Sequence, residues 1–507
     1  MPTNIRSIVI VGDGIAAWLT ASALARTLRN NVYKIHIMRS ASRADNQDDS
    51  LGCVSAAEAT LPSTAEYLHD LGYDENALLN TTKGCFTLGT AISDWAASEN
   101  TPRGTVFNAF GEVGASMASV AFPQLVMRLH EAGHQAKFAN YSLAALCAQS
   151  GRFARPTDDQ RSVLSVLAYG LHVDVAAYTQ AMKADALANG AQLVDAKFNH
   201  AVVGQEGLIT AVIGADTQRV DGDLFIDCTG PARQLATHAR DVKFSSWQHW
   251  LPCDKVSSVL HRSSDAPQPF THLTAQPAGW QRLISLPGKQ SETTCFQSLF
   301  TTTDVASTAQ DYLAGCCEQP WYKNCVVLGG AAAVVDPTAS LAIHLLQSAI
   351  QRLLTLLPNE RHCDTEATEY NRQAALELEC ARDYAMLPYK LNGRNGEPFW
   401  DHCRHMSVPD TLTHRIALYE SCGRIALHDG EVADAMNWLA LFDAQGIHPK
   451  QYDAVARGIA ITAILEHCTR VRAVMLRAVA ALPTHAAYLN RLKATAGATI
   501  AATLAKR

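Results

Sequence analysis

The spacing of hydrophobic and polar positions changes several times along the chain, and each change predicts an element. Residues 7–11 form a short apolar run that is typical of a buried strand, and a Gly-Asp-Gly turn follows at residues 12–14. An Ala- and Leu-rich segment then predicts a helix to about residue 30, and residues 32–38 predict a second strand. This order predicts a βαβ unit, whose two strands run parallel in one sheet.

Two further segments show a strand that ends in small residues. They lie at residues 223–230 and 325–332, and an apolar helix is expected from about 340 to 356. We therefore predict an α/β fold in which residues 1–364 form a discontinuous Rossmann-like domain with inserted substrate-covering segments. From 365 to 507 the pattern is helical, with Pro388, Pro398 and Pro409 as breaks, and predicts a helical C-terminal cap.

Composition narrows the class of protein. The 507 residues are 48% hydrophobic with a net charge of −6, and no basic run suited to a phosphate backbone appears, so we expect no nucleic-acid partner. No apolar stretch reaches about 18 residues and no export signal precedes the first strand, which predicts a soluble, cytoplasmic protein without membrane association. The 14 cysteines lack any C-x-x-C pair, so we expect buried free thiols and no metal site.

The first turn carries the candidate chemistry. Gly12-Asp13-Gly14-Ile15-Ala16-Ala17 follows a strand and opens a helix, the context in which amide groups at a helix N-terminus bind a pyrophosphate. Ala17 stands at the third glycine position of the pattern. Arg39, at the end of the second strand, stands where an acidic residue usually binds ribose hydroxyls. By itself this pattern is a weak signal for a dinucleotide.

Trp18 follows the turn, and G-x-G-x-x-[GA]-W resembles the first motif of the flavin-dependent tryptophan halogenases. Other motifs of that family have counterparts in the same order over nearly the whole chain. They are Glu58-Ala59-Thr60-Leu61-Pro62, residues 169–174, 223–230 and 250–255, Asp336-Pro337 to His344, Tyr370-Asn371 and residues 389–392.

The resemblance implies an FAD enzyme that receives its reduced flavin (FADH2) from a separate flavin reductase and acts on a small aromatic substrate; a homodimer is left open. In such enzymes hypohalous acid passes to a second site, where a Lys captures or orients it and a Glu assists. The residues that the resemblance assigns to the cofactor are Gly12, Gly14, Ala16, Ala17, Trp18, Arg39, Glu58, Ala59, Thr60, Gly230 and Gly330.

At its chemical centre the chain departs from the family. Phe86-Thr87-Leu88-Gly89, with Trp95 eight residues after Thr87, places Thr87 where the family has its Lys, while Lys83 is expected to be a surface residue. Ala339 stands at the position of the family's Glu. A hydroxyl cannot form a chloramine, and alanine offers no carboxylate for proton transfer.

Neighbouring motifs depart as well. Leu341 and Ala342 replace the Thr-Gly pair whose amides border the halide, which adds bulk at an anion site. The family's W-x-W-x-I-P reads Trp280-Gln281-Arg282-Leu283-Ile284-Ser285, so Trp280 remains and the second Trp is lost. Asp336 remains, although a carboxylate before a helix is commonly an N-cap. Gly330 stands where the family usually has Asn or Asp near the ribityl chain.

Three hypotheses follow. The first is an atypical monooxygenase or oxidase on an indole-like or larger aromatic substrate, because both partners of the relay are lost together. The second is a halogenase with an altered relay, for which the sequence names no substitute residue. The third is a non-catalytic FAD-binding paralogue. We favour the first over the second because both relay partners are lost together, and the intact turn and the Glu58-Ala59-Thr60 segment favour cofactor binding over the third.

Overall fold

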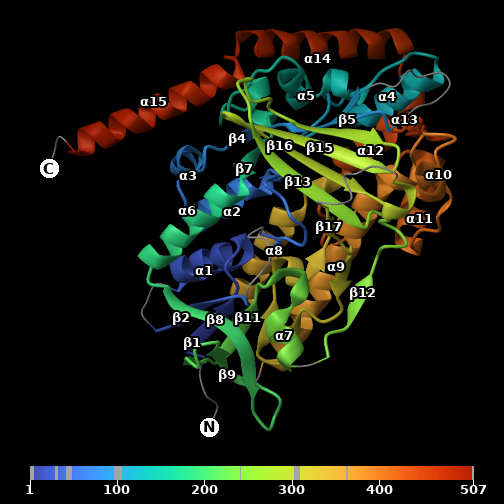
Figure 1. The fold of residues 1–507 in the computed structure, drawn as a ribbon. Helices are drawn as coiled ribbons and strands as arrows, with labels where there is room; N and C mark the ends of the chain where they lie inside the picture. The colour runs from blue at the N-terminus through green and yellow to red at the C-terminus, as the bar shows by residue number, and fades with distance from the viewer. Residues whose placement is uncertain are drawn as a thin grey trace.

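A mostly parallel sheet forms one end of the molecule in the computed structural model, which describes residues 5–28, 32–41, 48–95, 105–239, 241–301, 309–360 and 363–504 (Figure 1). Its eight strands lie in the order β10-β9-β8-β2-β1-β11-β20-β19, and the five from β8 to β20 are parallel. Their bounds are β1 Ser7–Val11, β2 Lys34–Arg39, β8 Gln192–Val203, β9 Ile209–Gly214, β10 Arg219–Asp221, β11 Leu224–Asp227, β19 Trp321–Tyr322 and β20 Cys325–Val327.

The predicted βαβ unit and the two downstream strands are confirmed by this sheet. In register, Val11 pairs with Asp227, and Asp227 pairs with Val327, so the carboxyl ends of β1, β11 and β20 meet at one edge. Helix α1, Ile15–Thr27, packs against α6, Val175–Ala188, on one face. Helix α7, Gln234–Ala239, contacts β8, β11 and β20. Ligands of open α/β sheets bind at this edge, where the turns after the strands lie.

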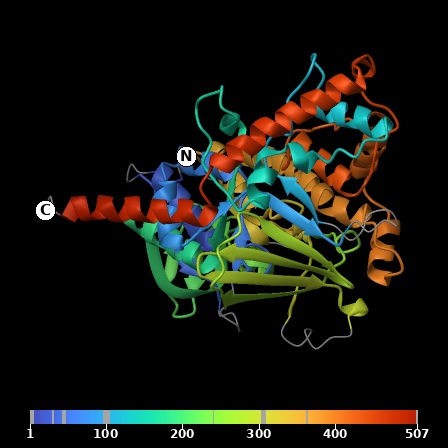
Figure 2. The same cartoon turned by 90° about the horizontal axis from the view of Figure 1, so that it is seen from above.

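A second sheet of seven strands stands above the first (Figures 1 and 2). Its order is β17-β13-β16-β15-β14-β5-β6, antiparallel except where β14 pairs with β5. Side chains of β15 alternate, and Trp280, Arg282 and Ile284 are buried on one face. The bounds are β5 Gly89–Ser93, β6 Thr105–Ala109, β13 Lys255–Arg262, β14 Thr271–Gln276, β15 Gly279–Leu286, β16 Lys289–Phe296 and β17 Gln310–Asp311.

Two small sheets connect these layers. One has the order β3-β7-β4 and holds Ala57–Ala59 and Cys85–Thr87 on either side of Gly170–Asp174. The other consists of β12 Phe244–Ser246, β18 Gly315–Cys317 and β21 Ala333–Val334. The small sheet β3-β7-β4 explains how the segment near Glu58 and the segment near Thr87, distant in sequence, come to the same region.

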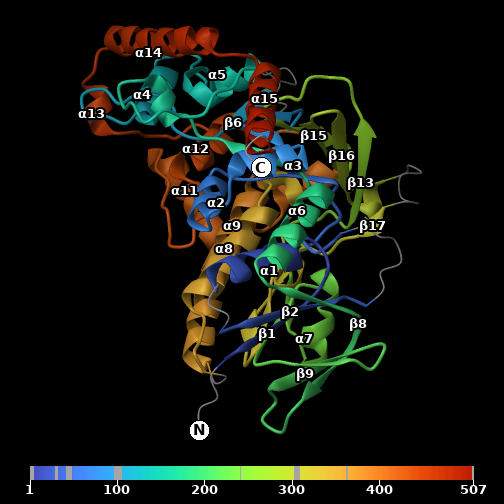
Figure 3. The ribbon, with the colours of Figure 1, turned by 90° about the vertical axis from the view of Figure 1, so that its left-hand side faces the viewer.

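Helices dominate the chain after residue 363, as predicted. Figure 3 shows α14 lying over α4 and α5 at the end opposite β1 and β2, and α15 extends away from the body in Figures 1 and 2. The helix break expected at Pro388 is not found, because this proline lies inside α9, near its end. The helices not yet placed are α2 Ser63–Asp70, α3 Glu75–Thr82, α4 Phe122–Glu131, α5 Leu143–Gln149, α8 Ala342–Thr355, α9 Asp364–Lys390, α10 Pro398–His405, α11 Asp410–Cys422, α12 Ala435–Ala444, α13 Ala454–Arg457, α14 Ile461–Ala481 and α15 His485–Leu504.

The cysteines agree with the prediction of free thiols: none forms a disulfide, and all but Cys316 and Cys422 are buried. Lys83 is exposed at the end of α3, as expected. None of the described helices is both long and apolar enough to cross a membrane. The division at residue 364 remains a prediction, because helices on its far side share two hydrophobic clusters with the sheets.

Candidate active site

The turn between β1 and α1 depends on two glycines for different reasons. Gly12 has a φ of +143°, and a Cβ atom there would lie 2.7 Å from the carbonyl oxygen of Cys228, just after β11. At Gly14 a Cβ atom would lie 2.2 Å from Oδ1 of Asp48. The first glycine therefore allows the turn to approach the neighbouring strand, and the second keeps open the space in front of the helix.

That space receives oxygen atoms from the segment that follows β2. The Ile15 N–H donates to Oδ2 of Asp48 at 2.7 Å, and the Ala16 N–H donates to Oγ of Ser50 at 3.1 Å. These oxygens stand in for those of an anionic ligand at the N-terminus of α1. The turn thus fits the pyrophosphate of a dinucleotide, provided that the Asp48 carboxylate moves away when the ligand binds.

Other residues predicted to bind the cofactor surround this turn or lie behind it. A Cβ atom at Gly330 would lie 2.4 Å from the backbone nitrogen of Gly52, so an Asn or Asp has no room there. Gly230 has a φ of +71° and packs on Asp49. Ala17 and Trp18 are buried within α1. Arg39 instead directs its guanidinium to Asp195 on β8, at 3.2 Å.

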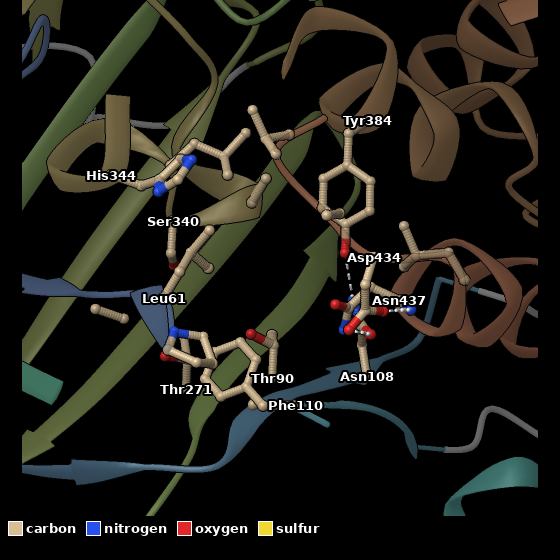
Figure 4. Close-up of a pocket in the computed structure, with 18 of the residues that line it drawn as sticks. Leu61, Thr90, Asn108, Phe110, Thr271, Ser340, His344, Tyr384, Asp434 and Asn437 are labelled. Carbon is tan, nitrogen blue, oxygen red and sulfur yellow. Dashed lines mark hydrogen bonds between the residues drawn. The ribbon is translucent and has the colours of Figure 1, made fainter. Parts of the chain in front are cut away.

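A second site is a cavity of about 440 Å³ between the seven-stranded sheet and the C-terminal helices (Figure 4). Thr87, from β4, and Ala339, from the short helix before α8, both line it. Leu341 also lines the cavity, and Ala342 begins α8. The structure therefore brings together the two positions that the sequence analysis predicts to replace the relay Lys and Glu. Thr87 is buried, and its hydroxyl donates to the Gly89 carbonyl at 3.3 Å.

The cavity has mostly apolar walls and few charges. Among its described lining residues there is no Lys or Arg, and His344 is the only basic type. Burial lowers the pKa of His344, whose Nδ1 lies 3.0 Å from the Ser63 hydroxyl. Glu431 pairs with Arg415 at 2.5 Å, and Asp434 caps α12. Both acids thus already have partners within the protein.

Sequence reasoning missed a group of polar side chains at one end of this cavity. The Nδ2 of Asn108 donates to the Tyr384 hydroxyl at 2.8 Å (Figure 4). The Nδ2 of Asn437 donates to the Ala109 carbonyl at 3.1 Å. They come from β6, α9 and α12. Nothing in their local sequence marks them, because the three elements meet only in the folded chain. They provide hydrogen-bonding atoms in an otherwise apolar cavity.

Asp336 lies behind the cavity in a buried hydrogen-bond network. Its Oδ1 accepts from the Thr338 N–H at 3.0 Å, which is the expected capping bond, and its Oδ2 accepts from the Tyr389 hydroxyl at 2.9 Å. The Trp280 Nε1–H donates to the same hydroxyl at 2.6 Å. Burial raises the pKa of Asp336. Trp280 and Asp336, both predicted at the site, therefore belong to one network, but neither lines the cavity.

Arg282 is a buried cation that sequence reasoning did not single out. Its side chain is 1% exposed and forms an ion pair with Glu58 at 2.7 Å. The same guanidinium donates to the Ser55 hydroxyl at 3.1 Å and to the Pro337 carbonyl at 3.2 Å. Arg282 thus joins the segment before Ala59 to the segment before Ala339. The available signal in the sequence was that Arg282 stands at the position where the family motif is expected to have its second Trp.

Comparison with known proteins finds relatives of this chain in one enzyme family. A sequence model described as tryptophan halogenase matches residues 7–460. The chain is 24% identical over 471 residues to a tryptophan 6-halogenase of Streptomyces toxytricini, covering 84% of this chain and 86% of the relative.

Solved structures show the same fold. A flavin-dependent halogenase from Brevundimonas sp. BAL3 superposes with a TM-score of 0.89 at 32% identity, covering 96% of this chain and 99% of the other. A flavin-dependent halogenase from Xanthomonas campestris has a TM-score of 0.89 at 29% identity, covering 97% and 99%.

Proposed function

Because this chain belongs to the tryptophan halogenase family, we propose that it is an FAD-dependent oxidoreductase that acts as an atypical monooxygenase or oxidase on a neutral aromatic substrate. The observation that carries the proposal is the pairing of Thr87 and Ala339 in one cavity that has no Lys or Arg among its described lining residues. Thr87 has no amine that could form a chloramine, and Ala339 has no carboxylate that could transfer a proton.

The FAD part of the proposal is supported by the turn after β1. The amides of Ile15 and Ala16 already bond oxygen atoms, and Gly14 leaves the space that a pyrophosphate needs. As a monooxygenase cofactor, FAD reduced by a separate flavin reductase would supply the two electrons that reduce one oxygen atom of O2 to water while the other enters the substrate; as an oxidase cofactor, oxidised FAD would instead take two electrons from the substrate and pass them to O2, giving H2O2. The protein's own contribution is to bind the cofactor and the substrate, to orient the substrate and to exclude water from the site.

The walls of the cavity support the substrate class. With no basic side chain except a histidine whose pKa is lowered by burial, a substrate carboxylate would lie there without a counter-ion. Leu61, Phe110 and Leu273 are among the apolar residues that would contact an aromatic ring. Asn108 and Tyr384 are placed to orient a polar group at its edge. We therefore favour an indole-like or larger aromatic compound without a free carboxylate.

A halogenase with an altered relay is the second candidate. It is favoured by the 32% identity to a flavin-dependent halogenase and by His344, a nitrogen nucleophile that lines the cavity. In this alternative the imidazole of His344 would take over the role of the missing Lys. The two candidates differ in the atom that the product gains.

A product analysis separates them. The protein is purified, loaded with FAD, and incubated with a flavin reductase, NADH, O2 and a panel of indoles and phenols, with and without bromide. Mass spectrometry is expected to find products heavier by one oxygen, or dehydrogenated, independent of bromide. A brominated product that disappears in His344→Ala would contradict the proposal and support the second candidate. Failure to bind FAD at all would overturn both.

A double substitution tests whether only the relay was lost. Thr87→Lys with Ala339→Glu restores both groups in one cavity, so gain of bromination by this variant would support the assignment of these two positions. Each single variant is the matched control, because Lys and Glu are expected to act together. Bromination by the unmodified protein would contradict the assignment.

A further inference from the structure

Three side chains with metal-binding atoms meet at a second cavity, away from the positions discussed above. His130, Asp443 and His448 each place a ligand atom within 4.8 Å of the other two. They line a cavity of about 690 Å³ whose described lining residues include none of those that line the cavity of Thr87 and Ala339. His130 lies far from the other two in sequence, so the three form no recognisable ligand motif.

The ends of two helices make this location favourable for a cation. His130 lies in the last turn of α4, and Asp443 lies in the last turn of α12. Helix C-termini carry partial negative charge, so two of them add to the charge of the Asp443 carboxylate. Lys137 lies near this carboxylate, whose Oδ2 accepts from the Phe138 N–H at 3.3 Å.

The hydrogen bonding of His130 also suits a ligand. Its Nε2 lies 2.6 Å from the carbonyl oxygen of Ala136, so Nε2 carries the proton and donates. In the neutral ring Nδ1 then carries the lone pair. A backbone carbonyl that accepts from the other ring nitrogen is the usual support of a metal-binding histidine. The His448 ring lies 4.5 Å from that of His130, centroid to centroid.

We propose that His130, Asp443 and His448 form a binding site for a divalent transition-metal ion of the Zn²⁺ class. Two imidazoles and one carboxylate are a ligand set that this class prefers, whereas Mg²⁺ and Ca²⁺ prefer oxygen ligands alone. Zinc lies about 2.0–2.2 Å from such ligands. Small side-chain rotations bring atoms that are within 4.8 Å of one another around a single ion. The cavity leaves room for a water molecule as a fourth ligand.

The ion would connect two elements of the substrate-covering part. It would join α4 to α12, and α12 separates the two cavities: Asn437 and Leu441 line the first, and Ala440 and Asp443 line the second. Binding would therefore hold the helix that forms one wall of the proposed substrate site. This site is independent of which reaction the enzyme performs.

The test uses the full-length protein after removal of metals with a chelator. Titration with Zn²⁺ in a calorimeter is expected to show one ion bound per chain, Co²⁺ to give a ligand-field absorption spectrum, and Mg²⁺ to show no binding. Asp443→Asn and His448→Ala are expected to weaken Zn²⁺ binding by about tenfold or more. Zn²⁺ should raise the melting temperature of the parent protein and not that of His448→Ala.

His134→Ala is the matched control, because His134 lines the same cavity without belonging to the cluster. It should bind Zn²⁺ as the parent does. His448 is exposed, so its substitution should leave the fold intact even if Asp443→Asn does not. No saturable Zn²⁺ binding by the parent, or equal binding by His448→Ala, would overturn the proposal.

Discussion

At the scale of single residues, the buried ion pair of Arg282 and Glu58 links the segments that lead to the cavity. A Trp position of the motif is occupied by a guanidinium that lies in the core and holds Ser55 and Pro337 in place. A buried charge is tolerated only with a partner and additional hydrogen bonds, and Arg282 has both. Arg282 therefore forms a polar connection between the two segments that lead to the cavity.

We predict that Arg282→Met destabilises the protein by about 3–5 kcal/mol, because it leaves Glu58 buried without its cation. The free energy of unfolding, measured by urea denaturation, checks this value. The double variant Arg282→Met with Glu58→Leu removes both charges and should recover most of the loss. A single variant as stable as the parent would show that Glu58 finds another partner or is neutral.

At the scale of elements, the turn between β1 and α1 combines a structural glycine with a ligand-binding glycine. A methyl group at Gly12 meets backbone of the neighbouring strand, whereas one at Gly14 meets the side chains of Asp48 and Ser50. Backbone cannot move away easily, but side chains can. The two positions should therefore respond differently to the same substitution.

We predict that Gly12→Ala lowers both stability and FAD affinity, while Gly14→Ala lowers FAD affinity with a smaller loss of stability. Quenching of FAD fluorescence and thermal unfolding measure the two effects. Asp48→Ala should bind FAD more tightly than the parent, because its carboxylate no longer competes for the Ile15 N–H. Weaker binding by Asp48→Ala would mean that this carboxylate helps to hold the cofactor.

At the scale of the whole molecule, the two predicted regions are tied together by shared packing. One cluster joins Ile8 and Ile10 of the nucleotide sheet to Tyr370 and Met475, and another joins Trp280 to Trp400 and Trp438. His485 adds a polar connection, since its Nδ1–H donates to the Pro267 carbonyl while its Nε2 accepts from the Phe86 N–H. The bond accepted by Nε2 requires the neutral ring, because both ring nitrogens carry a proton in the charged form.

We predict that acid lowers the free energy of unfolding, because buried histidines such as His485 take up protons when the chain unfolds. Burial lowers the pKa of His485 to about 4 and that of His172 to about 3, from about 6.5 in the unfolded chain. Below pH 6.5 the unfolded state binds more protons, so stability falls as pH falls, by about 1.4 kcal/mol per pH unit for each histidine until its folded pKa is reached.

Urea denaturation between pH 7 and pH 5 checks the slope. His485→Gln should be less stable than the parent at pH 7 but lose less on acidification, because one of the two groups is gone. Exposed His414 provides a control, since His414→Gln should keep the slope of the parent. If His485→Gln and the parent lost stability with pH at the same rate, His485 would not contribute to the loss of stability in acid.

Local patterns were sufficient for the strands at 7–11, 223–230 and 325–332, because parallel strands buried on both faces appear as continuous apolar runs between small-residue turns. They were also sufficient to predict the C-terminal helices and to identify the family. Pro388 was misread as a break, since α9 continues only to Lys390 and the proline lies in its last turn.

The sequence by itself determined the parallel sheet and the glycine turn, and it predicts that Thr87 and Ala339 stand where the family has a Lys and a Glu, because these depend on residue type and spacing along the chain. Only the tertiary structure decided that Thr87 and Ala339 face one cavity, that Arg282 holds Glu58, and that His130, Asp443 and His448 meet. Each of these depends on contacts between elements distant in sequence, which packing of the sheets and helices creates and no local pattern records.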